Sequence, residues 1–263
     1  MQNIRNKFKR ELQRLFLLTC LILGICLPAK AIVIEMSLLI DGSGSVGLTD
    51  FNNQMLSYKT VFSNSFHTNF LNPGDQLYVS AYQFATNVTL EQSTFLIDSD
   101  ASASAFGDVL GSLIWDAGWT NTGAALIEAS NDLMGNGINA ERSLIHMVTD
   151  GNPCLPDHLG GCPQSVGQLA PFIISNDLQV SAIGVGDGLN PVYIESVTAH
   201  LDLIDNYASL QSTLVDVFAR DLYSVPSSVP EPSSVLLVLS ALGMLTVGRR
   251  RIDFKKTGSS PGN

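Results

Sequence analysis

Basic residues are almost missing from the central part of this 263-residue chain. Eleven of its 14 lysine and arginine residues lie before residue 32 or after residue 248, and residues 32–232 keep only Lys59, Arg142 and Arg220 against 22 acidic residues. That segment therefore has a formal charge of −19. A field of this sign repels nucleic acids and anionic membrane surfaces, so we expect no nucleic-acid partner, good solubility and a tendency to bind cations. Most of these acidic side chains can simply form a solvated surface and have no other role.

Long apolar runs are also few, and the two that occur lie near the ends of the chain. The first, Leu15–Leu27, follows a basic start and precedes Ala29-Lys30-Ala31, which fits the small-x-small pattern of a cleavage site. We therefore predict that residues 1–31 are a secretory signal peptide that is cleaved after Ala31. A retained membrane anchor is the alternative, although the apolar run is short for a membrane span.

Cysteine is scarce, since the chain has four and removal of residues 1–31 would leave two. We predict that this pair, Cys154 and Cys162, forms one disulfide that closes a small loop, because an exported chain enters an oxidising compartment. A zinc site that also uses Asp157 and His158 is the alternative, but one short Cys-His cluster is poor support for it.

The most informative stretch is Ile32–Asp50, which reads IVIEMSLLIDGSGSVGLTD. Its first nine residues are almost all apolar, as in a strand covered on both faces, and a helix is expected after the Gly/Ser turn. Asp41 ends the strand, and Ser43 and Ser45 alternate with glycines that let the backbone bend sharply. One carboxylate and two hydroxyls can then converge, and such hard oxygen donors suit Mg²⁺, Mn²⁺ or Ca²⁺.

Three other interpretations apply to the same turn. Its glycines spell G-x-G-x-x-G, the dinucleotide fingerprint, but Asp41 would put a negative charge beside the pyrophosphate, and the acidic residue expected about 20 positions later is missing from the next strand. Catalysis by Ser43 or Ser45 is a second interpretation, and neither serine lies in a G-x-S-x-G elbow. The third is a Gly/Ser loop that only connects two elements.

Three segments together resemble one known family. Asp41-Gly42-Ser43-Gly44-Ser45 resembles the Asp-x-Ser-x-Ser signature of von Willebrand factor type A (vWA) domains. Gly118–Leu126 resembles the family's Gly-x-Thr-x-Thr-Gly segment, and Leu144–Gly151 resembles its strand-Thr-Asp-Gly segment. The resemblance implies a metal-ion-dependent adhesion site (MIDAS) whose ligands or near-ligands are Asp41, Ser43, Ser45 and Thr120, with Asp150 acting directly or through water.

Strands and helices alternate along the segment 32–225, which is long enough for one domain with a full core. This order predicts an α/β fold with a doubly wound, mostly parallel central sheet flanked by helices and one antiparallel edge strand, as in vWA and Rossmann-like domains. His146, inside a strand, is interpreted as a packed core residue. The expected strands are 32–40, 77–84, 88–95, 143–148, 178–185 and 201–207, and the expected helices are 49–66, 98–113, the Thr120 loop to near Met134, 163–175, 191–198 and 210–222.

The C-terminal part has three features in order. Residues 226–234 are a Pro/Ser linker that contains Pro230-Glu231-Pro232, and residues 235–263 hold an apolar segment and a basic tail with Arg249-Arg250-Arg251. This arrangement resembles the PEP-CTERM sorting signal of Gram-negative, biofilm-forming bacteria. The resemblance implies transient membrane insertion through this segment, processing by an exosortase and release to the exterior. A permanent C-terminal anchor is the alternative, but the apolar segment is short for a stable span.

These features lead to one main functional hypothesis. The chain is expected to be an exported, non-enzymatic adhesion module that uses a divalent cation, Mg²⁺ or else Mn²⁺ or Ca²⁺, to hold a protein or an acidic polysaccharide at the cell surface or in the extracellular matrix. The alternatives are a secreted hydrolase acting on matrix polymer, and a structural matrix protein with a non-functional metal site.

Overall fold

The first strand, β1 (Val33–Asp41), lies inside a sheet and is buried over almost all of its length. Its side chains enter two apolar clusters, one on each face of the sheet, which explains its continuous apolar sequence. Ala31–Ser224 form one compact unit of the chain. The structure is a computed structural model, and it describes residues 31–152, 171 and 173–223, together with residues 5, 8, 11 and 13.

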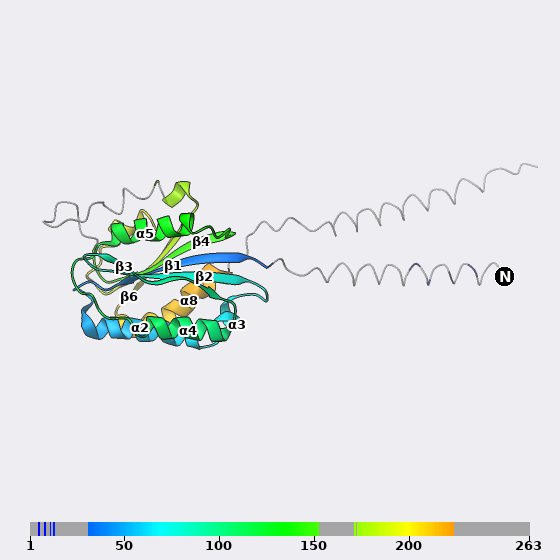
Figure 1. Cartoon of the computed structure of the whole chain (residues 1–263), viewed down its shortest axis with the longest axis horizontal. Coiled ribbons are helices and arrows are strands. Elements are labelled where there is room, and N and C mark those ends of the chain that lie inside the picture. The colour runs from blue at the N-terminus through cyan, green and yellow to red at the C-terminus, as the bar shows by residue number, and fades with distance from the viewer. Residues whose placement is uncertain are drawn as a thin grey trace, which may run out of the picture. The chain divides into compact units, whose positions relative to one another are not determined.

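The sheet has six strands in the order β3-β2-β1-β4-β5-β6 (Figure 1). All neighbours are parallel except β2 and β3, which form an antiparallel pair at one edge. This confirms the predicted doubly wound α/β fold with its antiparallel edge strand. The bounds of the strands after β1 are β2 (Gln76–Phe84), β3 (Val88–Ile97), β4 (Arg142–Thr149), β5 (Gln179–Val185) and β6 (His200–Ile204).

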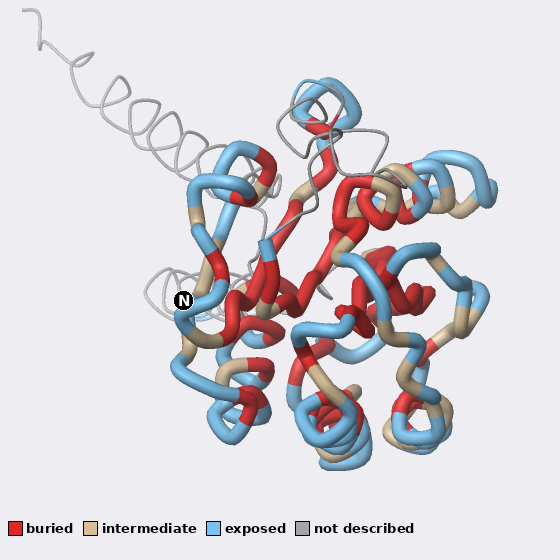
Figure 2. The backbone as a smooth tube through the Cα atoms, turned by 90° about the vertical axis from the view of Figure 1, so that its left-hand side faces the viewer, coloured by how far each residue is buried: buried red, intermediate tan, exposed pale blue. Residues whose placement is uncertain are grey.

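Helices cover both faces of the sheet, and α5 lies on the opposite face from α2, α3, α4 and α8 (Figure 1). Figure 2 shows the strands as a buried layer, while the helices are buried mainly on the side that meets them. The helical bounds are α2 (Gly47–Ser63), α3 (Phe66–Phe70), α4 (Asp100–Leu110), α5 (Thr122–Gly135), α7 (Val192–Glu195), the 3-10 turn η1 (Tyr207–Ser209) and α8 (Leu210–Tyr223).

Several sequence-based boundaries differ from the structure by a few residues, and two of these differences have a clear local cause. The last strand was expected to reach Tyr207, but β6 ends at Ile204 and Tyr207 begins η1. The side chain of Asn206 accepts a hydrogen bond from the Ala208 amide at 3.0 Å, and this cap turns the chain into a helical conformation before α8. Helix α2 begins at Gly47 rather than Thr49, and Gly47 has a positive φ of 69° that suits a residue without a β-carbon.

Aromatic rings join the helices on the α2 face. The ring centroid of Phe62 on α2 lies 4.3 Å from that of Phe66, 5.0 Å from that of Phe106 and 5.8 Å from that of Phe218. All four side chains are fully or almost fully buried, and they come from α2, α3, α4 and α8. Truncating such a residue to alanine typically costs about 3–5 kcal/mol, so this cluster fixes how the four helices sit on the sheet.

His146 is a packed core residue, as expected. Its ring centroid lies 5.0 Å from that of Phe218 and 6.3 Å from that of Tyr58, and neither ring nitrogen has a hydrogen-bond partner. Burial lowers the pKa of this histidine to about 4, so the ring is neutral in the folded protein at neutral pH.

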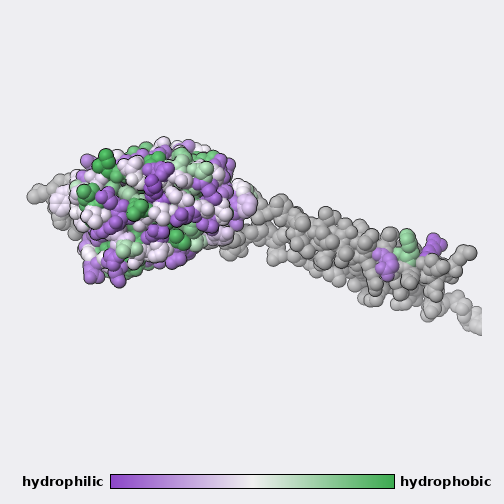
Figure 3. All heavy atoms as spheres, turned by 90° about the horizontal axis from the view of Figure 1, so that it is seen from below, coloured by the Kyte–Doolittle hydropathy of each residue, from purple (hydrophilic) through white to green (hydrophobic). Residues whose placement is uncertain are grey.

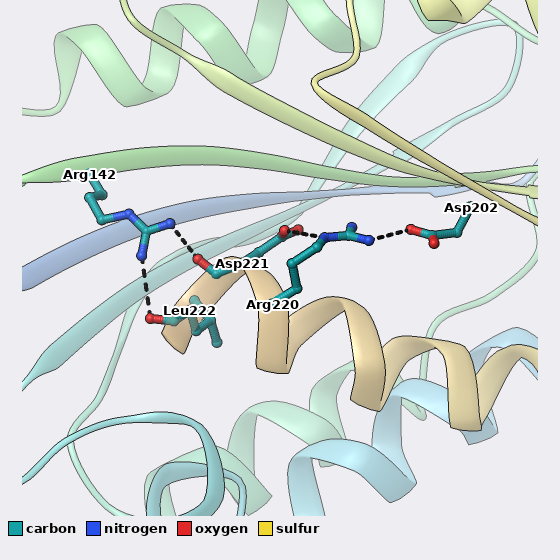
Figure 4. A network of polar contacts seen from close by, with 5 residues as sticks. All are labelled: Arg142, Asp202, Arg220, Asp221 and Leu222. Carbon is teal, nitrogen blue, oxygen red and sulfur yellow. Dashed lines mark hydrogen bonds and ion pairs between the residues drawn. The ribbon is translucent and has the colours of Figure 1, made fainter. Parts of the chain in front are cut away.

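The C-terminal end of α8 is tied to the sheet by two arginines (Figure 4). The guanidinium of Arg142 donates to the backbone carbonyls of Asp221 and Leu222, which lack intrahelical partners at a helix end. Arg220 forms ion pairs with Asp221 at 3.0 Å and with Asp202 on β6 at 2.9 Å. Two of the three basic residues of the central segment are therefore committed to this network.

The ends of the chain and the cysteine loop lie outside the described residues. Four isolated residues of the predicted signal peptide are described, and the rest of it is not. Also outside the described residues are Cys154 and Cys162, most of the predicted helix 163–175, and the linker and apolar segment after residue 225. Within the part that is described, no helix is long and apolar enough to cross a membrane. On the face seen in Figure 3, hydrophobic and hydrophilic residues of the domain are intermixed.

Candidate metal centre

The ends of β1 and β4 bring the first two segments of the candidate centre together. The two strands are parallel neighbours, and Ile40 pairs with Val148 in their register, so the residues that follow leave the same edge of the sheet. Thr149 Oγ1 donates a hydrogen bond of 2.5 Å to Asp41 Oδ2. Asp150 therefore begins its loop beside the turn that Asp41 opens. Ligand sites in open α/β sheets commonly occur at this carboxyl edge.

The β1–α2 turn folds its hydroxyls back toward Asp41 and Asp150. The Ser43 amide donates to Asp41 Oδ1 at 2.8 Å, and the hydroxyls of Ser43 and Ser45 share a hydrogen bond of 3.0 Å. Ser45 Oγ then donates to Asp150 Oδ1 at 2.8 Å. Asp41, Ser43, Ser45 and Asp150 thus form a continuous chain of polar contacts, although Ser45 and Asp150 are 105 residues apart in sequence.

Thr120 comes from a third loop that closes over the same turn. The Gly44 amide donates to the Gly118 carbonyl at 2.8 Å, which joins the two loops directly. A β-carbon added to Gly151 would lie 2.9 Å from Thr120 Oγ1 and 3.2 Å from Ser45 Oγ. The two hydroxyls therefore face the same glycine, and a larger residue there would crowd them. The structure brings all five predicted site residues to one place.

Both carboxyl groups of the centre resist ionisation. Burial raises the pKa of Asp41 to about 6, although hydrogen bonds from Ser43 and Thr149 favour its charged form. Burial also raises the pKa of Asp150, and repulsion from Asp50 acts in the same direction. Two acidic groups close together without a compensating positive charge are the situation that a bound cation relieves.

The donor set fits a hard divalent cation. Within residues 31–152 and 173–223 no group of three or more His, Cys, Asp or Glu side chains could hold a metal. The candidate centre instead combines two carboxylates with three hydroxyls, and all five donors are oxygen atoms. Oxygen ligands of this kind suit Mg²⁺, Mn²⁺ or Ca²⁺ better than softer metals.

Three residues outside the predicted set hold the centre in place, two through its backbone and one through a side chain. Gln54 on α2 donates through Nε2 to the Asp41 carbonyl at 3.0 Å, and the indole N–H of Trp115 donates to the Ser43 carbonyl at 3.1 Å. Thr149 bonds the Asp41 carboxylate directly. Only Thr149 had a sequence signal, because it directly precedes Asp150 in the strand-Thr-Asp-Gly segment.

The alternative interpretations of the turn find little support in its geometry. The amides of Gly42, Ser43 and Gly44 already donate to Phe84, Asp41 and Gly118, so they are not available to a pyrophosphate. In the described part of the chain, no histidine bonds to either serine hydroxyl, and His146 packs in the core instead. Among the described residues the turn therefore offers its serines no histidine base, and the group that accepts from Ser45 is the Asp150 carboxylate.

The fold and this oxygen-lined centre define an α/β domain with a candidate cation site at the carboxyl edge of its sheet. The chain belongs to the von Willebrand factor type A family, because the profile of that domain matches residues 35–213. The PEP-CTERM protein-sorting motif matches residues 228–252, which confirms the second resemblance. This motif indicates export to the surface or the exterior with exosortase-type processing.

Solved structures with the same fold include proteins named as matrix proteins and adhesins. Proximal thread matrix protein 1 from the mussel byssus has a TM-score of 0.55 and 19% identity, over 73% of this chain and 48% of that one. A form of it has zinc in its MIDAS motif, with a TM-score of 0.55 and 16% identity over 73% and 48% of the two chains. The pilus adhesin SpaC from Lactobacillus rhamnosus GG has a TM-score of 0.57 and 14% identity, over 74% and 31%.

At these identities the likeness establishes the fold. The matches span 48% of the mussel protein and 31% of the adhesin, so this chain corresponds to about half of those proteins or less. A search of curated proteins found no match to the sequence.

Proposed function

We propose that this protein is an exported, metal-dependent binding module that acts at the cell surface or in the extracellular matrix. The observation that supports the proposal most is the meeting of Asp41, Ser43, Ser45, Thr120 and Asp150 from three separate loops. A loop that only connects two elements would not need hydroxyls and carboxylates from three places. The family and the sorting motif are consistent with an exported binding protein.

The five oxygen donors have different roles in this proposal. Asp41, Ser43, Ser45 and Thr120 are ligands or near-ligands of a divalent cation, and Asp150 binds it directly or through a water molecule. The contacts that Asp41 receives from Thr149 and Ser43 keep its carboxylate oriented before the cation arrives. When bound, the ion supplies a coordination position that an anionic oxygen of a partner can occupy. Mg²⁺ is the first candidate, with Mn²⁺ and Ca²⁺ as alternatives.

The partner is a protein or an acidic polysaccharide that offers a carboxylate. The domain works against such a ligand at long range, because the formal charge of residues 32–232 is −19. Binding should therefore depend completely on the cation, and association should become faster as added salt screens the repulsion. This salt dependence is the reverse of ordinary electrostatic steering.

The division of the chain is part of the same proposal. Residues 1–31 are the signal peptide, residues 32–225 the binding domain, and residues 226–234 an exposed linker. Residues 235–263 enter the inner membrane transiently until an exosortase-type enzyme releases the protein, which we assign to a Gram-negative host. A disulfide between Cys154 and Cys162 is also proposed, and it would limit the loop that follows Asp150.

We infer a non-enzymatic role for the module. The serine hydroxyls of the turn bond to each other and to Asp150, a carboxylate that this proposal assigns to the cation rather than to proton transfer. The hydrolase hypothesis would need a general base beside a serine, and among the described residues the contacts of Ser43 and Ser45 include no histidine.

The test is a binding assay with extracellular matrix extract from the native host, measured on the immobilised chain in Mg²⁺ and in EDTA. Thr120→Ala combined with Asp150→Ala should abolish the Mg²⁺-dependent signal. The matched control is Thr68→Ala combined with Asp100→Ala, which removes another Thr-Asp hydrogen bond, 2.6 Å long, between α3 and α4. Binding that persists in EDTA or in the Thr120/Asp150 double variant would contradict the proposal.

A further inference from the structure

Helix α5 ends in a short turn that contains the one Asn-Gly pair of the chain, Asn136-Gly137. The Asn136 amide donates to the Asp132 carbonyl, and Asn136 keeps a helical conformation with φ −80° and ψ −6°. Gly137 then ends the helix with a positive φ of 81°, and an added β-carbon there would meet no atom within 4 Å. The turn therefore needs glycine for its backbone conformation and not because space is short.

The side chain of Asn136 holds this helix end against the sheet. Its Nδ2 donates to Oε1 of Glu35, which lies 101 residues away on the central strand β1. Its Oδ1 accepts from the Ile138 amide at 3.0 Å. Glu35 is only 2% exposed, and its Oε2 has no hydrogen-bond partner among the described residues. A buried carboxyl group thus depends on one side-chain donor, and that donor is the Asn136 amide.

The surroundings of Glu35 make this donor important. Burial raises the pKa of Glu35, the hydrogen bond from Asn136 lowers it, and repulsion from Asp132 raises it. Oδ2 of Asp132 is also buried, and within the described part of the chain it has no hydrogen-bond partner. The charge that acts on Glu35 is therefore negative, and a further carboxylate here would add repulsion in a region that water hardly screens.

An Asn-Gly pair can turn its asparagine into a carboxylate without an enzyme. The Gly137 nitrogen attacks Asn136 Cγ, the bond from Cγ to Nδ2 breaks, and Nδ2 leaves as ammonia with the proton of the Gly137 amide. Water then opens the resulting succinimide ring to aspartate or isoaspartate. Glycine has no side chain that would hinder its nitrogen, and in residues 31–152 and 173–223 no hydrogen bond engages the Gly137 amide. Asn136 is exposed, so water reaches the ring.

We propose that Asn136 is a site of spontaneous deamidation, which releases the C-terminal end of α5 from β1 as the exported protein ages. The product has lost the donor of Glu35 and places another carboxylate beside it, and isoaspartate also lengthens the backbone at the helix end. The ring cannot close while Asn136 keeps its helical conformation. The hydrogen bond to Glu35 therefore restrains the reaction, and the product accumulates slowly because hydrolysis of the amide is not reversed.

The experiment follows the reaction in the purified full-length chain, stored at neutral pH for several weeks. Cleavage after Glu128 and Glu141 gives the peptide 129–141, which contains Asn131, Asn136 and Asn139. Fragmentation in a mass spectrometer should place most of the deamidation at Asn136. Asn139 is the internal control, because it is also exposed but precedes an alanine, whose side chain hinders attack by its nitrogen.

Asn136→Asp reproduces one product and tests its effect on the fold. Its melting temperature should lie about 5 °C below that of the parent, because the buried Glu35 loses its donor. Hydrogen exchange of residues 129–141 should become faster, since the end of α5 is released. Asn139→Asp is the matched control, because it adds the same charge at an exposed position three residues later, and it should change neither measurement.

Two substitutions of Glu35 test the restraint. Glu35→Met removes the acceptor but keeps the length of the side chain, and Asn136 should then deamidate about tenfold faster, as expected when a hydrogen bond to a carboxylate no longer has to break. Glu35→Gln keeps an acceptor for Asn136 Nδ2 and should react at close to the parent rate.

Each part of the proposal has a result that overturns it. If Asn136 stays intact, or reacts no faster than Asn139, it is not a deamidation site. If Asn136→Asp melts and exchanges like Asn139→Asp, deamidation does not release α5. If Asn136 reacts at the same rate or more slowly in Glu35→Met than in Glu35→Gln, the contact with Glu35 is not a restraint.

Discussion

Asp41→Asn is the substitution that tests the metal centre most directly. It removes the buried charge while keeping the size of the side chain. In the cation-free protein, burial raises the pKa of Asp41 above its unfolded value of 3.8 to about 6. A raised pKa means that the stabilising contribution of this group is present below about pH 4 and is lost as pH rises through about 6. At pH 7.5 the ionised carboxylate therefore destabilises the fold.

The size of both effects can be worked out. The rise of the Asp41 pKa from 3.8 to about 6 corresponds to about 3 kcal/mol of lost stability at pH 7.5 for this fully buried group. Asparagine removes that cost, but it keeps only one acceptor for the two donors, Ser43 N and Thr149 Oγ1, which costs about 1–3 kcal/mol. We therefore expect the cation-free variant to be as stable as the parent or slightly more stable.

The response to the cation should differ strongly between the two chains. At a Mg²⁺ concentration about 100 times its Kd, binding to the folded state adds about 2.7 kcal/mol. For a domain of this size, that raises the melting temperature by about 5–10 °C. Asp41→Asn should lose most of this rise, because the ion loses one of only two carboxylates. Below about pH 6 the parent should also respond less, since protons compete for Asp41.

The assay is thermal unfolding followed by circular dichroism, with each chain measured in EDTA, Mg²⁺ and Mn²⁺. Asp108→Asn is the matched control, because it removes an aspartate that pairs with Lys59 on the helix surface at 3.0 Å. This control should keep the full response to Mg²⁺. A parent chain without any response to Mg²⁺ or Mn²⁺, or an Asp41→Asn variant with an unchanged response, would refute the reasoning.

Three further predictions concern other parts of the chain. Trp115→Phe should weaken Mg²⁺ binding about fivefold in a calorimetric titration, because the indole hydrogen bond to the β1–α2 turn is lost; Trp119→Phe is its control, and equal affinities would contradict this role. Burial lowers the pKa of His146 to about 4, so this residue takes up a proton mainly when the protein unfolds. Its neutral, buried form therefore contributes its full stability above about pH 6.5, and this stability is lost as the pH falls toward 4. When the pH falls from 7 to 4.5, the free energy of unfolding measured with urea should therefore decrease by about 2–3 kcal/mol more for the parent than for His146→Leu. Equal decreases in the two chains would disprove this role of His146. Mass spectrometry of protein exported by its own host should find a start near Ile32 and no peptide containing Met244; intact peptides with Met244 would refute the sorting hypothesis.

Much of the fold could be predicted because the local patterns agree with the tertiary structure. The apolar run of β1 predicted a strand buried on both faces, and the short turn after β2 predicted an antiparallel edge strand. Boundaries were less predictable. The end of β6 depends on the side chain of Asn206, which could equally have stayed in an extended segment until its hydrogen bond to the Ala208 amide formed.

The candidate site also has residues that the sequence predicted and residues that it did not. Asp41, Ser43, Ser45, Thr120 and Asp150 could be named in advance because they lie in short segments with recognisable composition. Two of the residues that support them, Gln54 and Trp115, could not be named. Gln54 and Trp115 act through backbone carbonyls of the turn, and an amide or indole donor leaves no pattern in sequence that identifies its acceptor. Whether the cation binds there is tested by the melting experiment.

The sequence by itself determined the class of fold, the order of the segments and the types of donor atom, because these depend on periodicity and on residue chemistry within short windows. Only the tertiary structure decided which groups meet. Parallel pairing of β1 with β4 puts Asp150 against a serine 105 residues away, and closure of the α4–α5 loop leaves Trp119 exposed beside Thr120. Such contacts depend on long-range packing, since side chains distant in sequence become neighbours only when the core that joins their strands has formed.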